Sequence, residues 1–200
     1  MNAVLASAFW YLGRGTGVTA LVLFTIAVAL GIGVRSGRPL AGLPRFGVHQ
    51  LHRTASLLAT SLLAVHVGTL LLDPYAQLRL VDVVLPFAGA YRPLWLGLGT
   101  LALDLLVAVV VTSLLRDRIG RRAWRTVHWA TYAAWPIALL HTLGTGTDAS
   151  TTWFRWIALV CTVTVAAAVL WRLTVTDPRR GLQSEQQPRM ATSSGVGGLS

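Results

Sequence analysis

Five long apolar segments alternate along the chain with polar or charged connections. They cover residues 8–34, 48–72, 93–115, 124–143 and 153–173. Each has about 20 residues or more, which is the length that a helix needs to cross a hydrocarbon core of about 30 Å. The pattern therefore predicts an all-α fold, a polytopic membrane bundle of about five transmembrane helices.

The composition agrees with a membrane protein and excludes a water-soluble domain. Hydrophobic residues make up 54% of the 200 residues, charged residues make up 12%, and the mean hydropathy is +0.61. Such a chain has too few polar side chains to cover a surface that faces water. We expect a short N-terminal segment at 1–7, a membrane domain at 8–173 and a disordered cytoplasmic tail at 174–200, rich in Ser, Gly, Gln and Pro. The start of the chain lacks a basic region, so the first apolar segment is expected to remain as a helix.

The basic residues, all of them arginine, are distributed unevenly between the two sides of the predicted bundle. Thirteen of the 17 lie around the first and third connections or after the last span, and the other four are Arg14, Arg79, Arg92 and Arg155. By the positive-inside rule, the N-terminus lies outside and the C-terminus in the cytoplasm, in the inner (plasma) membrane of the cell. The net charge of +10 does not indicate nucleic-acid binding, because the arginines flank apolar segments and form no stripe of their own.

The connection at residues 73–92 is the longest and is predicted to lie on the outer side. Its segment 78–85 is apolar enough to lie on the membrane surface or to cap a cavity. Tryptophans at the ends of the spans fit an interfacial aromatic belt: Trp95, Trp124, Trp153 and Trp171.

All five histidines fall within predicted spans, with His49, His52 and His66 in the second and His128 and His141 in the fourth. Ionisable side chains are expensive in lipid, so each is a functional candidate. The 14 residues from His52 to His66 and the 13 from His128 to His141 each correspond to about 20 Å of helix. Because the two spans run in the same direction, the four histidines can pair at two depths.

Two facing imidazoles at each of two depths indicate two b-type haems, each with two histidine ligands. Neutral imidazole binds haem iron well, and two axial imidazoles favour electron transfer over oxygen activation. The single cysteine, Cys161, excludes a CxxCH attachment site. In an ideal helix, 13 residues leave His141 about 140° from His128. A kink with a locally altered turn at Pro136 could restore the alignment. One haem, or no haem with histidines that join helices by hydrogen bonds, remains an alternative.

Several other polar residues lie at the predicted haem levels. Arg53 and Arg125 at the inner ends of the spans and Arg155 at the outer end are candidate partners for haem propionates, although membrane anchoring also explains the first two. We predict that His49, one turn before the first ligand candidate, contacts the interface or a propionate and not the iron. Asp104, in the third span, is expected to pair with a neighbouring helix.

Certain segments resemble the ferric reductase-like transmembrane domain family. They are WYLGRGTG at the first span, HQLHR with His66 fourteen residues after His52, PFAGAYRP before the third span, and WRTVH followed by Tyr132 and His141 in the fourth. This family includes NADPH oxidases, ferric-chelate reductases and the haem-binding membrane subunit of bacterial methionine sulfoxide reductase systems. The resemblance covers approximately residues 10–171. It implies that His52 and His128 bind the cytoplasmic-side haem and that His66 and His141 bind the outer haem.

The resemblance also implies what partners the chain needs. Oxidases and ferric reductases of this family continue into FAD- and NAD(P)H-binding domains, but this sequence contains no GxGxxG-like segment. We therefore expect the haem subunit of an oxidoreductase system, surrounded by membrane lipid, with FMN, FAD or quinone supplied through a partner. The expected donor is a cytoplasmic flavin reductase or membrane quinol, and the expected acceptor is an extracytoplasmic flavoprotein or another redox acceptor. The alternatives are a haem-free scaffold or transporter subunit and a quinol-linked b-type cytochrome of another family.

Overall fold

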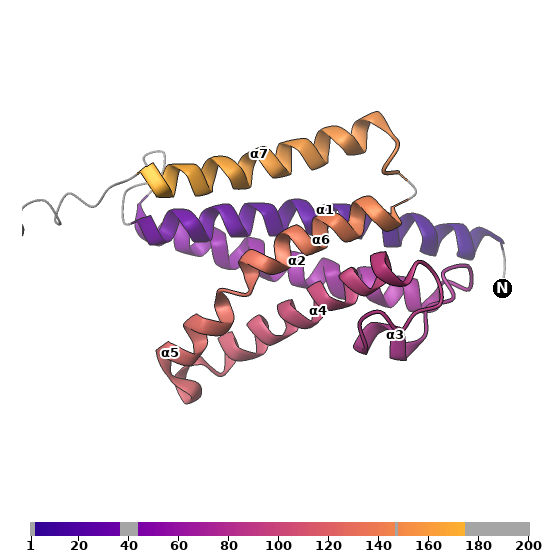
Figure 1. Ribbon diagram of the computed structural model, residues 1–200, viewed down its shortest axis with the longest axis horizontal. Helices are drawn as coiled ribbons and strands as arrows, with labels where there is room; N and C mark the ends of the chain where they lie inside the picture. The colour runs from indigo at the N-terminus through magenta and orange to yellow at the C-terminus, as the bar shows by residue number, and fades with distance from the viewer. Residues whose placement is uncertain (1–2, 37–43, 147, 175–200) are drawn as a thin grey trace, which may run out of the picture.

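The computed structural model describes residues 3–36, 44–146 and 148–174, and in these ranges the chain is helical apart from short connections. The described helices, drawn in Figure 1, are α1 (Ala3–Ser36), α2 (Arg45–Leu72), α3 (Leu80–Val84), α4 (Pro93–Leu114), α5 (Arg116–His128), α6 (Thr131–Thr145) and α7 (Thr152–Thr174). The tail expected at 174–200 lies outside the described residues, apart from Thr174.

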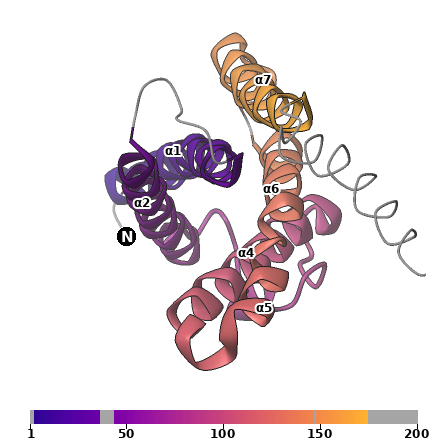
Figure 2. The same ribbon diagram turned by 90° about the vertical axis from the view of Figure 1, so that its left-hand side faces the viewer.

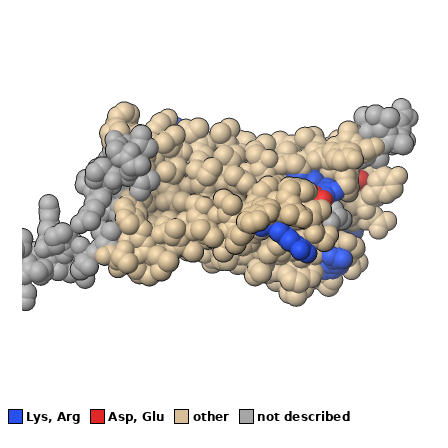
Figure 3. Space-filling view, turned by 90° about the horizontal axis from the view of Figure 1, so that it is seen from above, with Lys and Arg blue, Asp and Glu red and all other residues tan. Residues whose placement is uncertain are grey.

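Four of these helices are long and apolar enough to cross a membrane. They are α1, α2, α4 and α7, and their bounds lie within a few residues of the predicted spans, although α1 begins earlier, at Ala3. Their apolar character persists on the outer surface, where Trp156, Leu159 and Val163 of α7 are exposed. On the face drawn in Figure 3, most of the surface along the bundle carries no charged side chain, and the charged side chains gather toward the end at which the N-terminus lies. The chain is a polytopic helical membrane protein.

The fourth predicted span is divided into two helices. The 13 residues of α5 and the 15 residues of α6 are separated at Trp129 and Ala130. Backbone hydrogen bonds between residues three apart occur here, from Ala130 N to Val127 O at 2.9 Å and from Ala133 N to Ala130 O at 3.0 Å. Such bonds are those of a 3₁₀ turn, which has three residues per turn in place of 3.6. The altered turn therefore lies before Pro136, which is inside α6.

The helices pack in pairs, which Figure 2 shows from one end. Helix α2 packs along α1 in the opposite direction, and α4 packs along α6. Helix α1 also contacts α6 and α7 and so joins the pairs. Among the described residues, α2 makes at most sparse backbone contacts with α6, although these two helices carry four of the five histidines.

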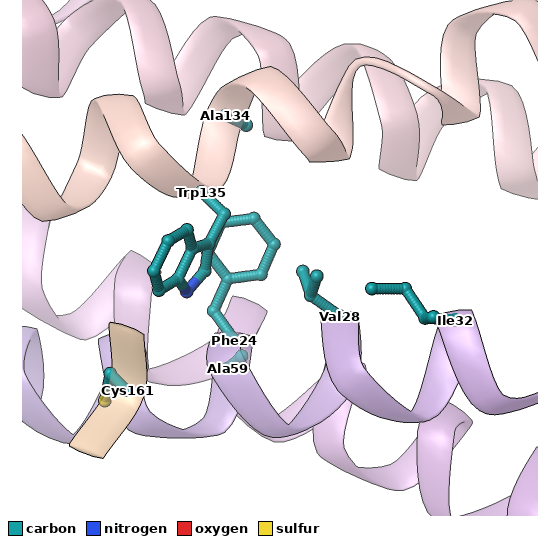
Figure 4. Packing of buried hydrophobic residues seen from close by; sticks show 7 residues of the cluster. All are labelled: Phe24, Val28, Ile32, Ala59, Ala134, Trp135 and Cys161. Atoms are coloured by element: carbon teal, nitrogen blue, oxygen red, sulfur yellow. The ribbon is translucent and has the colours of Figure 1, made fainter. Parts of the chain in front are cut away.

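The hydrophobic core lies where α1, α2, α6 and α7 meet. Phe24 and Trp135 lie side by side in this cluster, with Ala59 behind and Cys161 on the α7 side (Figure 4). The indole Nε1 of Trp135 donates a hydrogen bond of 2.9 Å to the hydroxyl of Thr25, which satisfies the buried N–H. The cluster lies midway along α2, since Ala59 is seven residues from both His52 and His66.

The long connection between α2 and α4 folds over the N-terminal end of α4. Its apolar segment contains the short helix α3. The Thr100 hydroxyl on α4 donates a hydrogen bond of 2.6 Å to the carbonyl oxygen of Asp82. Phe87 lies directly against Gly97, where any larger residue would collide with its ring. These contacts fix the connection on α4.

Candidate functional site

Four histidines from three helices form two levels within the bundle. His52 and His66 lie on α2, His128 is the last residue of α5, and His141 lies on α6. All four are half-buried. Along α2 the two levels are 14 residues apart, which corresponds to about 21 Å of helix.

At the first level, the rings of His52 and His128 are neighbours in an edge-to-face arrangement. Their centroids are 6.4 Å apart, and their planes are inclined by 70°. Two imidazoles that bind one metal ion from opposite sides, with metal–nitrogen bonds of about 2 Å, have centroids about 6 Å apart. The separation therefore suits a shared metal ion. His128 also stacks on Trp124 of its own helix, at 5.0 Å between centroids.

The second level contains His66 on α2 and His141 on α6. The Nδ1 of His66 lies 2.6 Å from the carbonyl oxygen of Gly13 on α1. The Nδ1 of His141 lies 2.8 Å from the carbonyl oxygen of Trp95 on α4. At the first level, the Nδ1 of His52 makes the same kind of contact, at 2.8 Å, with the Ala27 carbonyl oxygen on α1.

These contacts determine which ring nitrogen carries the proton. A carbonyl oxygen can only accept, so Nδ1 of His52, His66 and His141 must donate. In the neutral ring, Nε2 then has the lone pair that a metal ion requires. Over the described ranges, no hydrogen-bond partner is found for Nε2 of these three histidines. In these three rings Nε2 is thus the nitrogen with a lone pair available to a ligand.

The sequence matches the family described as ferric reductase like transmembrane component over residues 16–139, well over half of the chain. The chain belongs to this family. The match includes His52, His66 and His128 and ends before His141. No curated protein and no solved structure matches the chain.

Three arginines were predicted to lie beside the haems. In this ferric reductase-like domain they are less closely associated with the histidines than the backbone carbonyls of α1 and α4 are. Arg53 and Arg125 have exposed side chains that lie near His52 and His128 in sequence. Arg155 is also exposed, and its Nε donates to the Ala149 carbonyl oxygen at 3.3 Å.

The remaining polar candidates have different surroundings. His49 is exposed and interacts electrostatically with His52. Asp104 is half-buried on α4. Across the ranges that the structure describes, no three His, Cys, Asp or Glu side chains are grouped to hold a bare metal ion.

Two arginines with structural roles at the end of the bundle where α4 begins were not singled out from the sequence. Arg14 on α1 forms an ion pair with Asp148, and its guanidinium lies 3.9 Å from the ring centroid of Trp10. Arg92, at the start of α4, donates a hydrogen bond of 2.8 Å to the Gly144 carbonyl oxygen. The sequence held one indication of these roles, since both residues belong to the four arginines on the less basic side of the predicted bundle.

Proposed function

We propose that this chain carries electrons across the plasma membrane through two b-type haems. In this proposal His52 and His128 bind one haem, and His66 and His141 bind the other. The chain is then the haem subunit of an oxidoreductase system that delivers electrons to an extracytoplasmic acceptor. Its family, described as ferric reductase like transmembrane component, supports a role in membrane electron transfer.

The observation that carries the proposal is the close approach of His52 and His128, with ring centroids 6.4 Å apart. Two imidazoles provide only the axial ligands of a six-coordinate iron, which suits a planar cofactor that supplies the other four. The scarcity of backbone contacts between α2 and α6 supports a group inserted between them.

The protein orients the ligand rings, sets the spacing between the two haems and excludes water from the region between them. Carbonyl oxygens of α1 and α4 hold three of the rings through Nδ1, so that Nε2 is directed to the cofactor. Haem with two axial imidazoles supplies one-electron chemistry and leaves no open position for oxygen. The core around Phe24 and Trp135 separates the two levels and keeps the interval dry.

The charge distribution assigns the two haem levels to the two sides of the membrane in this proposal. Thirteen of the 17 arginines fall on the side that we assign to the cytoplasm, so His52 and His128 lie nearer the donor. The donor is a cytoplasmic flavin reductase or membrane quinol, and the acceptor is an extracytoplasmic flavoprotein or another redox protein. Exposed Arg53 and Arg125 are available to propionates at the inner level, and Arg155 at the outer one.

Haem content of purified variants tests the proposal. The wild-type chain, expressed with excess haem, should show b-type bands in a reduced-minus-oxidised spectrum and about two haems per chain. His52→Ala and His128→Ala should each leave one haem, and the double variant should also leave one, because both residues serve the same iron. His66→Ala and His141→Ala should remove the other haem. His49→Ala is the matched control and should retain both.

Two results would contradict this assignment. Absence of b-type bands from the wild-type chain would favour a haem-free scaffold. A double variant of His52 and His128 that loses both haems, while the corresponding single variants each lose one, would contradict the proposed pairing.

A further inference from the structure

The same local arrangement surrounds three of the four proposed ligands. Each ring donates from Nδ1 to a carbonyl oxygen of a neighbouring helix, and its Nδ1 edge lies against a glycine four residues further along that helix. The carbonyl–glycine pairs are Ala27 and Gly31 for His52, Gly13 and Gly17 for His66, and Trp95 and Gly99 for His141.

Helix geometry explains the spacing of four. Side chains of an α-helix lean toward its N-terminus, so the side chain at position i+4 lies beside the carbonyl at position i. That carbonyl already accepts the N–H of residue i+4, but its oxygen has a second lone pair. A glycine at i+4 leaves the second lone pair accessible to a group from another helix.

The rings occupy the space that a methyl group would take. A Cβ at Gly99 would lie 2.5 Å from Nδ1 and Cε1 of His141, and a Cβ at Gly17 would lie 2.8 Å from the same atoms of His66. At Gly31 the contact is looser, 3.3 Å to Cε1 of His52. The two pairs on α1 are also in register with α2, since Gly17 and Gly31 are 14 residues apart, as are His52 and His66.

We propose that Gly17, Gly31 and Gly99 are positioning residues for the ligand histidines. Each glycine admits an imidazole edge to the carbonyl four residues earlier, which fixes the Nδ1–H tautomer and directs Nε2 to the iron. This inference rests on the proposed haem function. It adds that α1 and α4, which carry none of the ligands, select the orientation and electron-donating strength of three of them.

The hydrogen bond has an electronic consequence as well as a geometric one. Donation from Nδ1 makes the imidazole a stronger donor through Nε2 and stabilises ferric over ferrous iron. An alanine that pushes the ring away from its carbonyl removes this effect. The reduction potential of that haem should therefore rise, while the other haem should be unchanged.

Alanine substitutions in the full-length protein provide the test. Gly17→Ala and Gly99→Ala should each alter only the haem of His66 and His141, with loss of up to one haem per chain or an upward shift of its potential. Gly31→Ala should retain both haems. It should shift the reduction potential of the haem of His52 and His128 by a smaller amount, because the contact between Gly31 and His52 is looser. Gly15→Ala and Gly68→Ala are matched controls, since a Cβ at these helical glycines meets nothing within 4 Å.

The outcomes separate this inference from the function on which it rests. A wild-type chain without haem contradicts the proposed function. If the wild-type chain binds two haems, then normal content and potentials in both Gly17→Ala and Gly99→Ala overturn the glycine proposal alone. Loss of both haems together from these two variants also overturns it, because the defect would then be general. Histidine ¹⁵N spectra of the haem-free protein provide a readout without iron, in which Gly99→Ala should shift His141 away from the Nδ1–H form.

Discussion

Asp82 is a buried carboxylate in the connection over the N-terminal end of α4. Its Oδ2 accepts from the backbone N of Arg79 at 3.1 Å and from Arg79 Nε at 3.2 Å, and its Oδ1 accepts from Nη2 at 3.0 Å. These hydrogen bonds and the Arg79 charge hold the pKa of Asp82 below its ordinary value. The ionised carboxylate therefore stabilises the start of α3 and the folded conformation of the connection between α2 and α4.

The sign of this effect predicts a pH dependence. A carboxyl group with a depressed pKa contributes fully above the pKa of the unfolded chain, about 4, and the contribution is lost as the pH falls through the lower folded value. Asp82→Asn should therefore lower the unfolding temperature at pH 7, and the difference from the wild-type protein should shrink toward pH 3. Thermal unfolding in detergent across this range measures it.

Asp117→Asn is the control, because its carboxylate is 93% exposed and should contribute little at any pH. A difference between Asp82→Asn and the wild-type protein that stays constant down to pH 3 would show that the side chain acts through its shape and not its charge.

At the same scale, the candidate ligands could be predicted but their supports could not. Histidines within lipid are conspicuous because burial is costly, and spacings of 14 and 13 residues suggested pairs. The supports are backbone carbonyls, which every residue possesses and no sequence pattern distinguishes. The glycines at 17 and 31 repeated the histidine spacing, but their meaning depends on the register between α1 and α2.

The division between α5 and α6 changes the rotation of His141 relative to His128 about the axis of the fourth predicted span. A residue in a 3₁₀ turn advances about 120° around the axis, against about 100° in an α-helix. A few such residues between Val127 and Ala133 therefore reduce the misalignment of about 140° between His128 and His141 by roughly half. Sequence periodicity identified an apolar segment here but not its interruption, because Trp129 and Ala130 are ordinary helix residues.

This location of the turn predicts that Pro136 is not needed for ligand alignment. Pro136→Ala should retain both haems and an equal or higher unfolding temperature, since proline inside a helix costs about 3 kcal/mol. By contrast, one alanine inserted after Ala130 should rotate α6 by about 100° and remove the haem of His66 and His141. Haem content and thermal unfolding measure both variants. Selective loss of that haem from Pro136→Ala would assign the alignment to the proline.

For the molecule as a whole, four of the five predicted apolar spans correspond to long helices, whereas the division of the fourth span and the pairing of the helices were not predicted. Length and hydropathy are local properties, so α1, α2, α4 and α7 agree with the expected spans. The pairing of α1 with α2 and of α4 with α6 depends on close contacts such as the ring of Trp95 against Gly144. Such contacts join residues that are distant in sequence, and no single segment indicates them.

The orientation of the bundle decides which haem level faces the donor, and cysteine labelling can determine it. Cys161 is 4% exposed, and Cys161→Ala gives a background without thiols. Ser150→Cys places an exposed thiol before α7, and Arg118→Cys places one on α5 at the opposite end. A membrane-impermeant maleimide should label the first variant in intact cells and the second only after lysis, because the arginines concentrate on the cytoplasmic side. The reverse pattern would place His66 and His141 nearer the cytoplasm and invert the proposed path of the electrons.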